Sequence, residues 1–179
     1  NAVWFSVAML RLRVVQPFQA AVIADHPYSS IAAATDEAHI RPVELNRNLL
    51  TTSPWREVTI EDLGWVRQHL RAAAELMKHA EFNRAFQTID SATLVNNPGA
   101  GIVIAWAAIE TLVRPGSFDI TKRLAKALAT FLHSPGPGRD KAYSEIKASY
   151  ATRGGAVHAG HVPDQEQFHG AFDLARCAL

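Results

Sequence analysis

The chain has 179 residues, with 48% hydrophobic and 20% charged side chains, and its 18 lysines and arginines nearly balance 17 aspartates and glutamates. This length supports one domain of ordinary size, or one domain with a small appendage, and a core that needs no covalent staples. The single cysteine, Cys177, excludes an internal disulfide framework and a cysteine-rich zinc module, so we expect a cytoplasmic protein. A net charge of +1 excludes a uniformly basic surface that coats nucleic acid without specificity.

Membrane segments are not predicted. The longest uncharged stretch, residues 91–109, is broken by Asn96-Asn97-Pro98-Gly99, and its apolar part is too short to cross a bilayer. The apolar run at residues 3–10 is followed at once by Arg11 and Arg13 and lacks the small-residue cleavage site of a signal peptide. We therefore expect no membrane partner.

The chain divides by composition into two parts. Residues 1–55 are predicted to form a small β-containing N-terminal segment, or the end of an upstream domain, and residues 56–179 a helical bundle. Within the first part, residues 25–30 have the composition of a turn and residues 50–55 that of a connector.

Two strands are predicted in the N-terminal segment. Apolar residues interleave with Arg11 and Arg13 across residues 7–15, and a second short apolar run covers residues 20–24 after Pro17. These patterns favour strands over helices.

From residue 56 onward the apolar residues recur at helical periods. Residues 102–113 are apolar nearly all round, with Glu110 as the only charge, which is typical of a helix in the middle of a bundle. On this helix Trp106 is expected in the core. Asp164-x-x-Gln167 resembles a capping box at the start of a terminal helix. The predicted helices cover residues 63–90 with a break near Glu81, 102–113, 120–131, 143–150 and 164–179.

Apolar stripes define the expected buried faces, and the short connections favour a mainly α fold, an up-and-down helical bundle. The first long helix and the third helix carry the clearest stripes, which comprise Leu63, Val66, Leu70, Ala73 and Met77, and Ile120, Leu124, Leu128 and Phe131.

The fourth predicted helix places an arginine where its stripe requires an apolar residue. The stripe Ile146, Tyr150 continues to Arg153, and burying a guanidinium is costly without an anionic partner. In one interpretation Arg153 snorkels, extending its charged end to solvent, or pairs with Glu110, the lone carboxylate of the apolar helix. In the other, Arg153 binds a phosphate and His158, whose unperturbed pKa is near neutral, moves a proton.

Helical geometry does not bring Arg153 and His158 onto one face. Five residues on an ideal helix correspond to about 140° of azimuth. A bend or helix end at Gly154-Gly155 could bring the two together, or two copies across a dimer could compose one site.

Arg153-x4-His158, preceded by Tyr150 and followed by Gly160, resembles the R-x4-6-H signature of HEPN domains. The resemblance extends to a W-x-x-x-E-x-L helix at residues 106–112 and a T-x-R-L helix at residues 121–124, which are similar to the ApeA-like HEPN branch. These blocks cover about residues 60–179 in the family's order.

This resemblance implies a helical bundle that dimerises so that two R-x4-H motifs face each other in a metal-independent endoribonuclease. His158 would be the general base on a ribose 2′-OH, and Arg153 would hold the scissile phosphate, leaving a 2′,3′-cyclic phosphate. Glu110, Arg123 and Tyr150 would have supporting roles. The resemblance also implies a toxin or phage-defence context, with a possible regulatory or antitoxin partner.

The local charge suits an RNA partner. Residues 119–160 contain seven basic and three acidic side chains, a local excess of +4. We expect Lys122, Lys126 and Lys147 to contact the RNA backbone, with binding that weakens in salt.

The identity of residue 154 favours an alternative function without catalysis. The residue after the arginine is usually polar in active HEPN members, and here it is Gly154. The alternative is therefore a catalytically inactive HEPN-like module for dimerisation or for binding RNA or nucleotides.

Other chemistry is less well supported. His158, His161 and His169 with Cys177 match no zinc spacing, so we expect no metal. Gly99-Ala-Gly101 lacks the lysine of a phosphate-binding loop, and we expect no cofactor.

Overall fold

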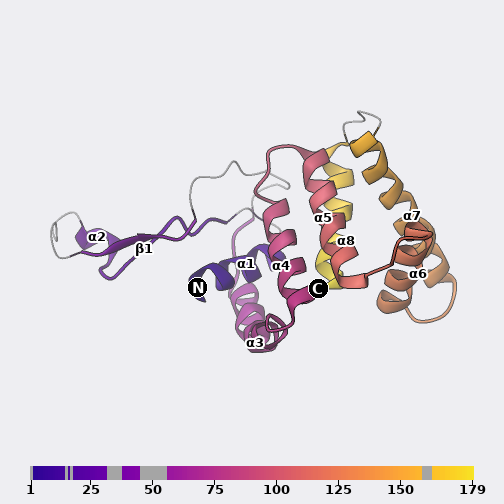
Figure 1. Cartoon of the computed structure of the whole chain (residues 1–179). Helices are drawn as coiled ribbons and strands as arrows, with labels where there is room; N and C mark the ends of the chain where they lie inside the picture. Colours follow the sequence, from indigo (N-terminus) through magenta and orange to yellow (C-terminus); the bar gives the residue numbers. More distant parts are fainter. Residues whose placement is uncertain (1, 15, 17, 32–37, 45–55, 159–162) are drawn as a thin grey trace.

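The computed structural model describes residues 2–14, 16, 18–31, 38–44, 56–158 and 163–179. The chain is mainly helical, as predicted, with one small two-stranded sheet near its N-terminus. The predicted connector at residues 50–55 lies outside the described residues. In Figure 1, α4, α5 and α8 run side by side in the middle, with α6 and α7 on one flank and α1 and α3 on the other.

The first predicted strand is wrong, because residues 7–15 belong largely to a helix. Helix α1 spans Ala2–Val14 and buries Ala8, Met9 and Leu12, which are spaced as on one helical face. Arg11 lies on the same buried face and is only 1% exposed. Its charge therefore did not mark a solvent-facing position, and the apparent alternation of apolar and basic residues was misleading.

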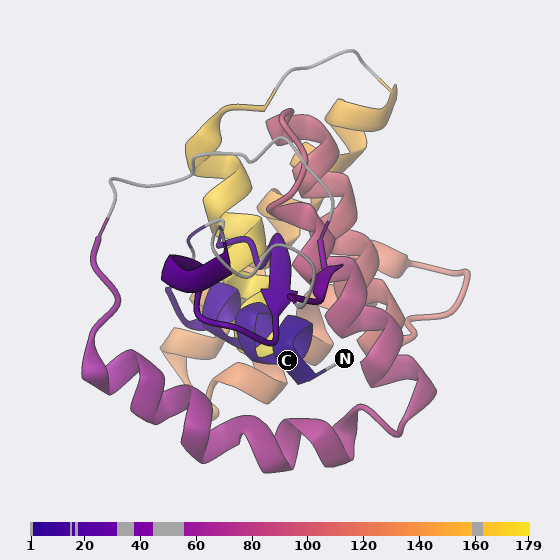
Figure 2. The ribbon, with the colours of Figure 1, turned by 90° about the vertical axis from the view of Figure 1, so that its left-hand side faces the viewer.

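The second predicted strand is confirmed, and it pairs with a strand that the sequence analysis did not predict. Strand β1 (Val22–Ala24) pairs antiparallel with β2 (Ile40–Pro42), with Ile23 opposite Arg41. The predicted turn contains a short helix, α2 (Tyr28–Ile31). The sheet extends away from the bundle in Figure 1, and Figure 2 views the molecule from that side.

The helical prediction from residue 56 onward is confirmed with shifted boundaries. The first long helix is divided into α3 (Ile60–Leu76) and α4 (Ala80–Ala92), so the break lies just before Glu81. The remaining helices are α5 (Pro98–Val113), α6 (Ile120–Leu132), α7 (Pro137–His158) and α8 (Gln165–Ala178).

Local signals explain where these helices begin. Asp164 accepts a hydrogen bond from the Gln167 backbone N–H, and the Gln167 side chain accepts one from the Asp164 backbone, so the predicted capping box is present. Asn97 caps α5, and Pro98 occupies its first turn, where a missing N–H costs nothing.

Helix α5 lies at the centre, as its apolar circumference predicted. It packs against α4, α8, α7 and α6, and Trp106 is fully buried. Close approach to α8 requires a glycine, because a Cβ at Gly101 would lie 2.5 Å from the Phe168 ring.

Two members of the predicted apolar stripes are exposed, although the others are buried or half-buried. Leu63 on α3 is 50% exposed and Phe131 on α6 is 72% exposed, while Leu124 and Leu128 lie in the core as expected. Both exposed residues lie near the ends of their helices.

Candidate functional site

Helices α5 and α7 bring three of the predicted site residues together. Glu110 on α5 accepts a hydrogen bond of 2.8 Å from the Tyr150 hydroxyl on α7. The Arg153 Nη2 lies 3.7 Å from the same Glu110 Oε1. The Arg153 guanidinium carbon lies 5.7 Å from the centroid of the Tyr150 ring, within cation–π range.

Two residues of α5, Trp106 and Glu110, contact Tyr150. Trp106, one turn before Glu110 on α5, meets the Tyr150 ring edge-on, with centroids 4.9 Å apart and an interplanar angle of 87°. Burial, together with the hydrogen bond to Glu110, raises the pKa of Tyr150 above its ordinary value. The hydroxyl therefore remains protonated and keeps one lone pair of Glu110 occupied.

Arg153 is only partly satisfied by these contacts. Its separation from Glu110 is too long for a hydrogen bond, so the two groups form a loose ion pair. Its Nε is buried without a hydrogen-bond partner among the described residues, and its side chain is 26% exposed. A guanidinium carries five donors, so several remain available for an anion. Pairing with Glu110, the simpler interpretation, is thus observed but incomplete.

Helix α7 runs without interruption through Gly154-Gly155 to His158. The glycine pair therefore neither ends nor breaks the helix, and the Cα atoms of Arg153 and His158 stay about 7.5 Å apart along the axis and about 140° apart around it. The side chain of His158 lies outside the described part of the structure. At Gly154 an added Cβ would meet no atom of the described residues within 4 Å, apart from its neighbours on the helix.

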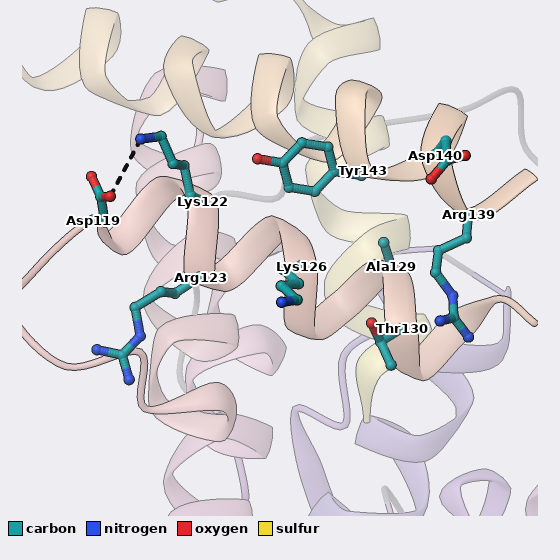
Figure 3. A pocket seen from close by; sticks show the side chains of 9 residues that line it. All are labelled: Asp119, Lys122, Arg123, Lys126, Ala129, Thr130, Arg139, Asp140 and Tyr143. Carbon is teal, nitrogen blue, oxygen red and sulfur yellow. Dashed lines mark hydrogen bonds and ion pairs between the residues drawn. The ribbon is translucent and has the colours of Figure 1, made fainter. Parts of the chain in front are cut away.

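The predicted RNA-contacting lysines divide between two places. Lys122 and Lys126 line a groove of about 490 Å³ between α6 and the start of α7, which we call the α6–α7 groove. Lys147 is exposed on α7 but is not among the residues that line the groove. Figure 3 shows the groove, which is lined by Asp119, Lys122, Arg123, Lys126, Ala129, Thr130, Arg139, Asp140 and Tyr143.

Arg123 belongs to this groove rather than to the trio around Glu110. Its Nη1 lies 3.0 Å from the position that a Cβ on Gly116 would take, so the guanidinium packs against the α5–α6 connection. The predicted supporting residues therefore separate, with Glu110 and Tyr150 beside Arg153 and Arg123 in the groove.

A second cluster, around Arg11, was not predicted from the sequence. Arg11 on α1 donates to both carboxylate oxygens of Asp90 on α4, at 2.6 and 3.0 Å, and to Glu44 at 2.8 Å. Arg11 also donates to the Phe18 carbonyl, and Trp4 donates to Asp90. The available signal was Asp90, an acid on the otherwise apolar buried face of α4.

Within the described residues, no group of three His, Cys, Asp or Glu side chains is placed to hold a metal ion. The described helices also include none with the length and apolarity needed to cross a membrane. Comparison of the chain with protein-family models, with curated proteins and with solved structures gives no match.

Proposed function

We propose that this protein is a metal-independent endoribonuclease of the HEPN type that acts as a homodimer. The observation that carries the proposal is the incomplete pairing of Arg153. A half-buried guanidinium stands 3.7 Å from its only carboxylate and has a buried Nε without a partner in the described structure. The exposed part of the guanidinium can accept an anion, and Arg153 lies on the helix that ends at His158.

A phosphodiester suits the free donors of Arg153. Guanidinium and phosphate groups form charge-assisted hydrogen bonds, which are stronger than neutral ones and geometrically specific. Glu110 is held by Tyr150 and so keeps Arg153 oriented without consuming all its donors. In this proposal Glu110 and Tyr150 are positioning residues.

The regular course of α7 supports a dimer in this proposal. Because Arg153 and His158 lie about 140° apart around one helix, a single copy does not present both on one face. A two-fold axis beside α7 would bring the motifs of two copies together, so that side chains from both copies contribute to each site. The same two-fold would compose two equivalent sites.

The proposed reaction is an internal transfer at phosphorus. His158 removes the proton from a ribose 2′-OH, and the 2′ oxygen forms a bond to the adjacent phosphorus. The bond from phosphorus to the 5′ oxygen breaks, and that oxygen receives a proton from the protonated histidine or from water. Arg153 neutralises the developing charge on the phosphoryl oxygens. The products are a 2′,3′-cyclic phosphate and a free 5′-OH.

Uncontrolled RNA cleavage harms the cell that produces the enzyme. The proposal therefore includes a toxin or phage-defence context and a regulatory or antitoxin partner. A cytoplasmic location would give it access to cellular RNA.

A second candidate is an inactive RNA-binding module. It is favoured by the fact that Arg153 already has a carboxylate neighbour, while the lysines of the α6–α7 groove lie apart from it. In that case Arg153 would have a structural role only.

The decisive experiment incubates the purified protein with total RNA in EDTA and reads the product ends. Wild type is expected to leave 2′,3′-cyclic phosphates, and His158→Ala and Arg153→Ala are expected to abolish them. His79→Ala is the matched control, because His79 is exposed and makes no side-chain capping hydrogen bond. Absence of cleavage by the folded dimer would favour the inactive module, and cleavage that survives in His158→Ala would reject the proposed site.

A further inference from the structure

The α6–α7 groove combines unpaired cations with an aromatic ring. Lys126 and Arg123 on α6 have no carboxylate partner among the described residues, while Lys122 pairs with Asp119 at 3.3 Å. Arg139 lies at one end of the groove and donates to the His133 carbonyl at 2.8 and 3.0 Å. Asp140 lies at the same end, so the middle of the groove is its most positive part.

Tyr143 supplies the aromatic ring. In Figure 3 its side chain extends from α7 towards α6, on the side of the groove opposite Lys126. The ring is half-buried and packs against the core, so its orientation is fixed before any ligand arrives. A fixed ring beside a row of cations is the arrangement with which proteins hold unpaired nucleotides, through base stacking and phosphate contacts.

We infer that the α6–α7 groove is a binding site for single-stranded RNA, in which Lys126 contacts a phosphate and Tyr143 stacks on a base. Identifying the ligand as RNA rests on the proposed function. The groove itself rests on separate residues, since none of those that line it belongs to the trio around Arg153.

The position of the groove relates it to the proposed cleavage site. Tyr143 and Arg153 are ten residues apart on α7, which corresponds to about 15 Å along the helix axis. Lys147, exposed and one turn after Tyr143, lies between them along the helix. A strand held at Tyr143 could thus follow α7 towards Arg153 over a few nucleotides, and the groove would act as a subsite that positions the RNA.

An unpaired strand fits this groove better than a duplex. Stacking on Tyr143 requires a base that is free of its partner, whereas A-form duplexes present mainly phosphates and 2′-hydroxyls across a wide, shallow groove. The acidic residues Asp119 and Asp140 near the ends of the groove would also repel the second phosphate backbone of a duplex.

The test measures binding without cleavage. A fluorescent single-stranded oligoribonucleotide is titrated against His158→Ala protein, with groove variants made in that background. Lys126→Glu is expected to weaken binding at least tenfold and to reduce the slope of log K against log salt by about 1. Tyr143→Leu is expected to weaken it about tenfold, and Tyr143→Phe to preserve it, because phenylalanine keeps the stacking face.

The matched control is Lys78→Glu, which makes the same charge change at an exposed lysine paired with Glu75 between α3 and α4. Its binding is expected to equal that of the parent protein. Lys126 is exposed, so Lys126→Glu keeps the inference testable if Tyr143→Leu fails to fold.

The outcomes distinguish failure of the proposed nuclease from failure of the proposed RNA-binding groove. Groove-dependent binding in a protein whose wild type cleaves nothing would reject the nuclease and retain the groove. Cleavage by wild type together with unchanged binding by Lys126→Glu and Tyr143→Leu would reject the groove and retain the nuclease. Equal competition by duplex RNA, or by inorganic phosphate at the same concentration, would reject a single-strand site.

Discussion

Two arginines of this chain occupy buried faces of helices, and their surroundings differ sharply. Arg11 is 1% exposed and meets Asp90, Glu44 and a backbone carbonyl, so its donors are matched by acceptors. Arg153 meets one carboxylate at 3.7 Å and leaves its buried Nε without a partner in the described residues. Burial of a cation therefore does not by itself indicate function. The degree to which its donors are satisfied is the more informative quantity.

The Arg11 cluster also joins separate parts of the chain. Asp90 lies on α4 and Glu44 follows β2, and Glu44 additionally accepts from the backbone N–H of Ala20 at 2.7 Å. Burial lowers the pKa of Arg11 and the hydrogen bonds to both acids raise it, with a net shift upward, so the guanidinium stays charged. Arg11 therefore links α1 and Glu44, which follows β2, to helix α4.

The largest expected effect is on stability at Arg11. Arg11→Ala would leave Asp90 and Glu44 buried without a cation, which typically costs about 3–5 kcal/mol in the free energy of unfolding. Chemical denaturation would measure it, with Arg67→Ala on the exposed face of α3 as the control. A loss below about 1 kcal/mol would show that Arg11 is no more important than a surface ion pair.

Substitution of Arg153 is expected to reduce RNA cleavage strongly and to change stability little. Arg153→Lys keeps the charge but loses the planar fork that grips phosphate, so RNA cleavage should fall at least about tenfold. The free energy of unfolding should change by less than about 1 kcal/mol, because the pair with Glu110 is partly exposed and loose. A large loss of stability with unchanged cleavage would assign Arg153 to the same structural class as Arg11.

A smaller effect is expected one residue further along α7. Gly154→Ala should stabilise the protein by about 0.5–1 kcal/mol, since alanine favours the helix and its methyl group meets open space. Thermal unfolding would measure the shift. Destabilisation instead would mean that the helix around Arg153 is occupied by a partner, for which a second copy is the first candidate.

A last effect concerns Asp62 at the start of α3, which Arg13 and Arg56 contact. Hydrogen bonds from Arg56 and then from the Thr59 backbone hold the pKa of Asp62 well below its usual range. A lowered pKa contributes stability above the ordinary value of about 3.9, and this contribution is lost as the pH falls. Asp62→Asn should therefore lower stability at pH 7 and flatten its decline below about pH 4.

Salt provides the check on this prediction. The arginines that contact Asp62 are partly exposed, so the difference between wild type and Asp62→Asn should shrink as ionic strength rises. The same salt series applied to Arg11→Ala should leave its effect nearly unchanged, because that cluster is buried.

The sequence predicted the helical body well because local signals and apolar periods agreed there. The uniform apolarity of residues 102–113 indicated a central helix, and the Asp164 capping box indicated the start of α8. The prediction failed at residues 7–15, where a charge on the buried face imitated strand alternation. Only its partners, 33 and 79 residues away along the chain, explain that charge, and no local pattern reveals them.

The candidate site was predictable in part. An arginine within an apolar stripe and a single acid on an apolar helix suggested that Arg153 and Glu110 meet, and they lie together. That Tyr150 would hold Glu110, and that Arg123 would lie elsewhere, depends on how α5, α6 and α7 pack.

The contact between Gly101 and Phe168 has a consequence for the evolution of this chain. The two positions share one volume at the crossing of α5 and α8, since a Cβ at residue 101 would penetrate the ring at residue 168. Related chains should therefore keep a glycine at the first position wherever the second is aromatic. Where a larger residue replaces the glycine, a smaller one should stand opposite, and the two positions should covary.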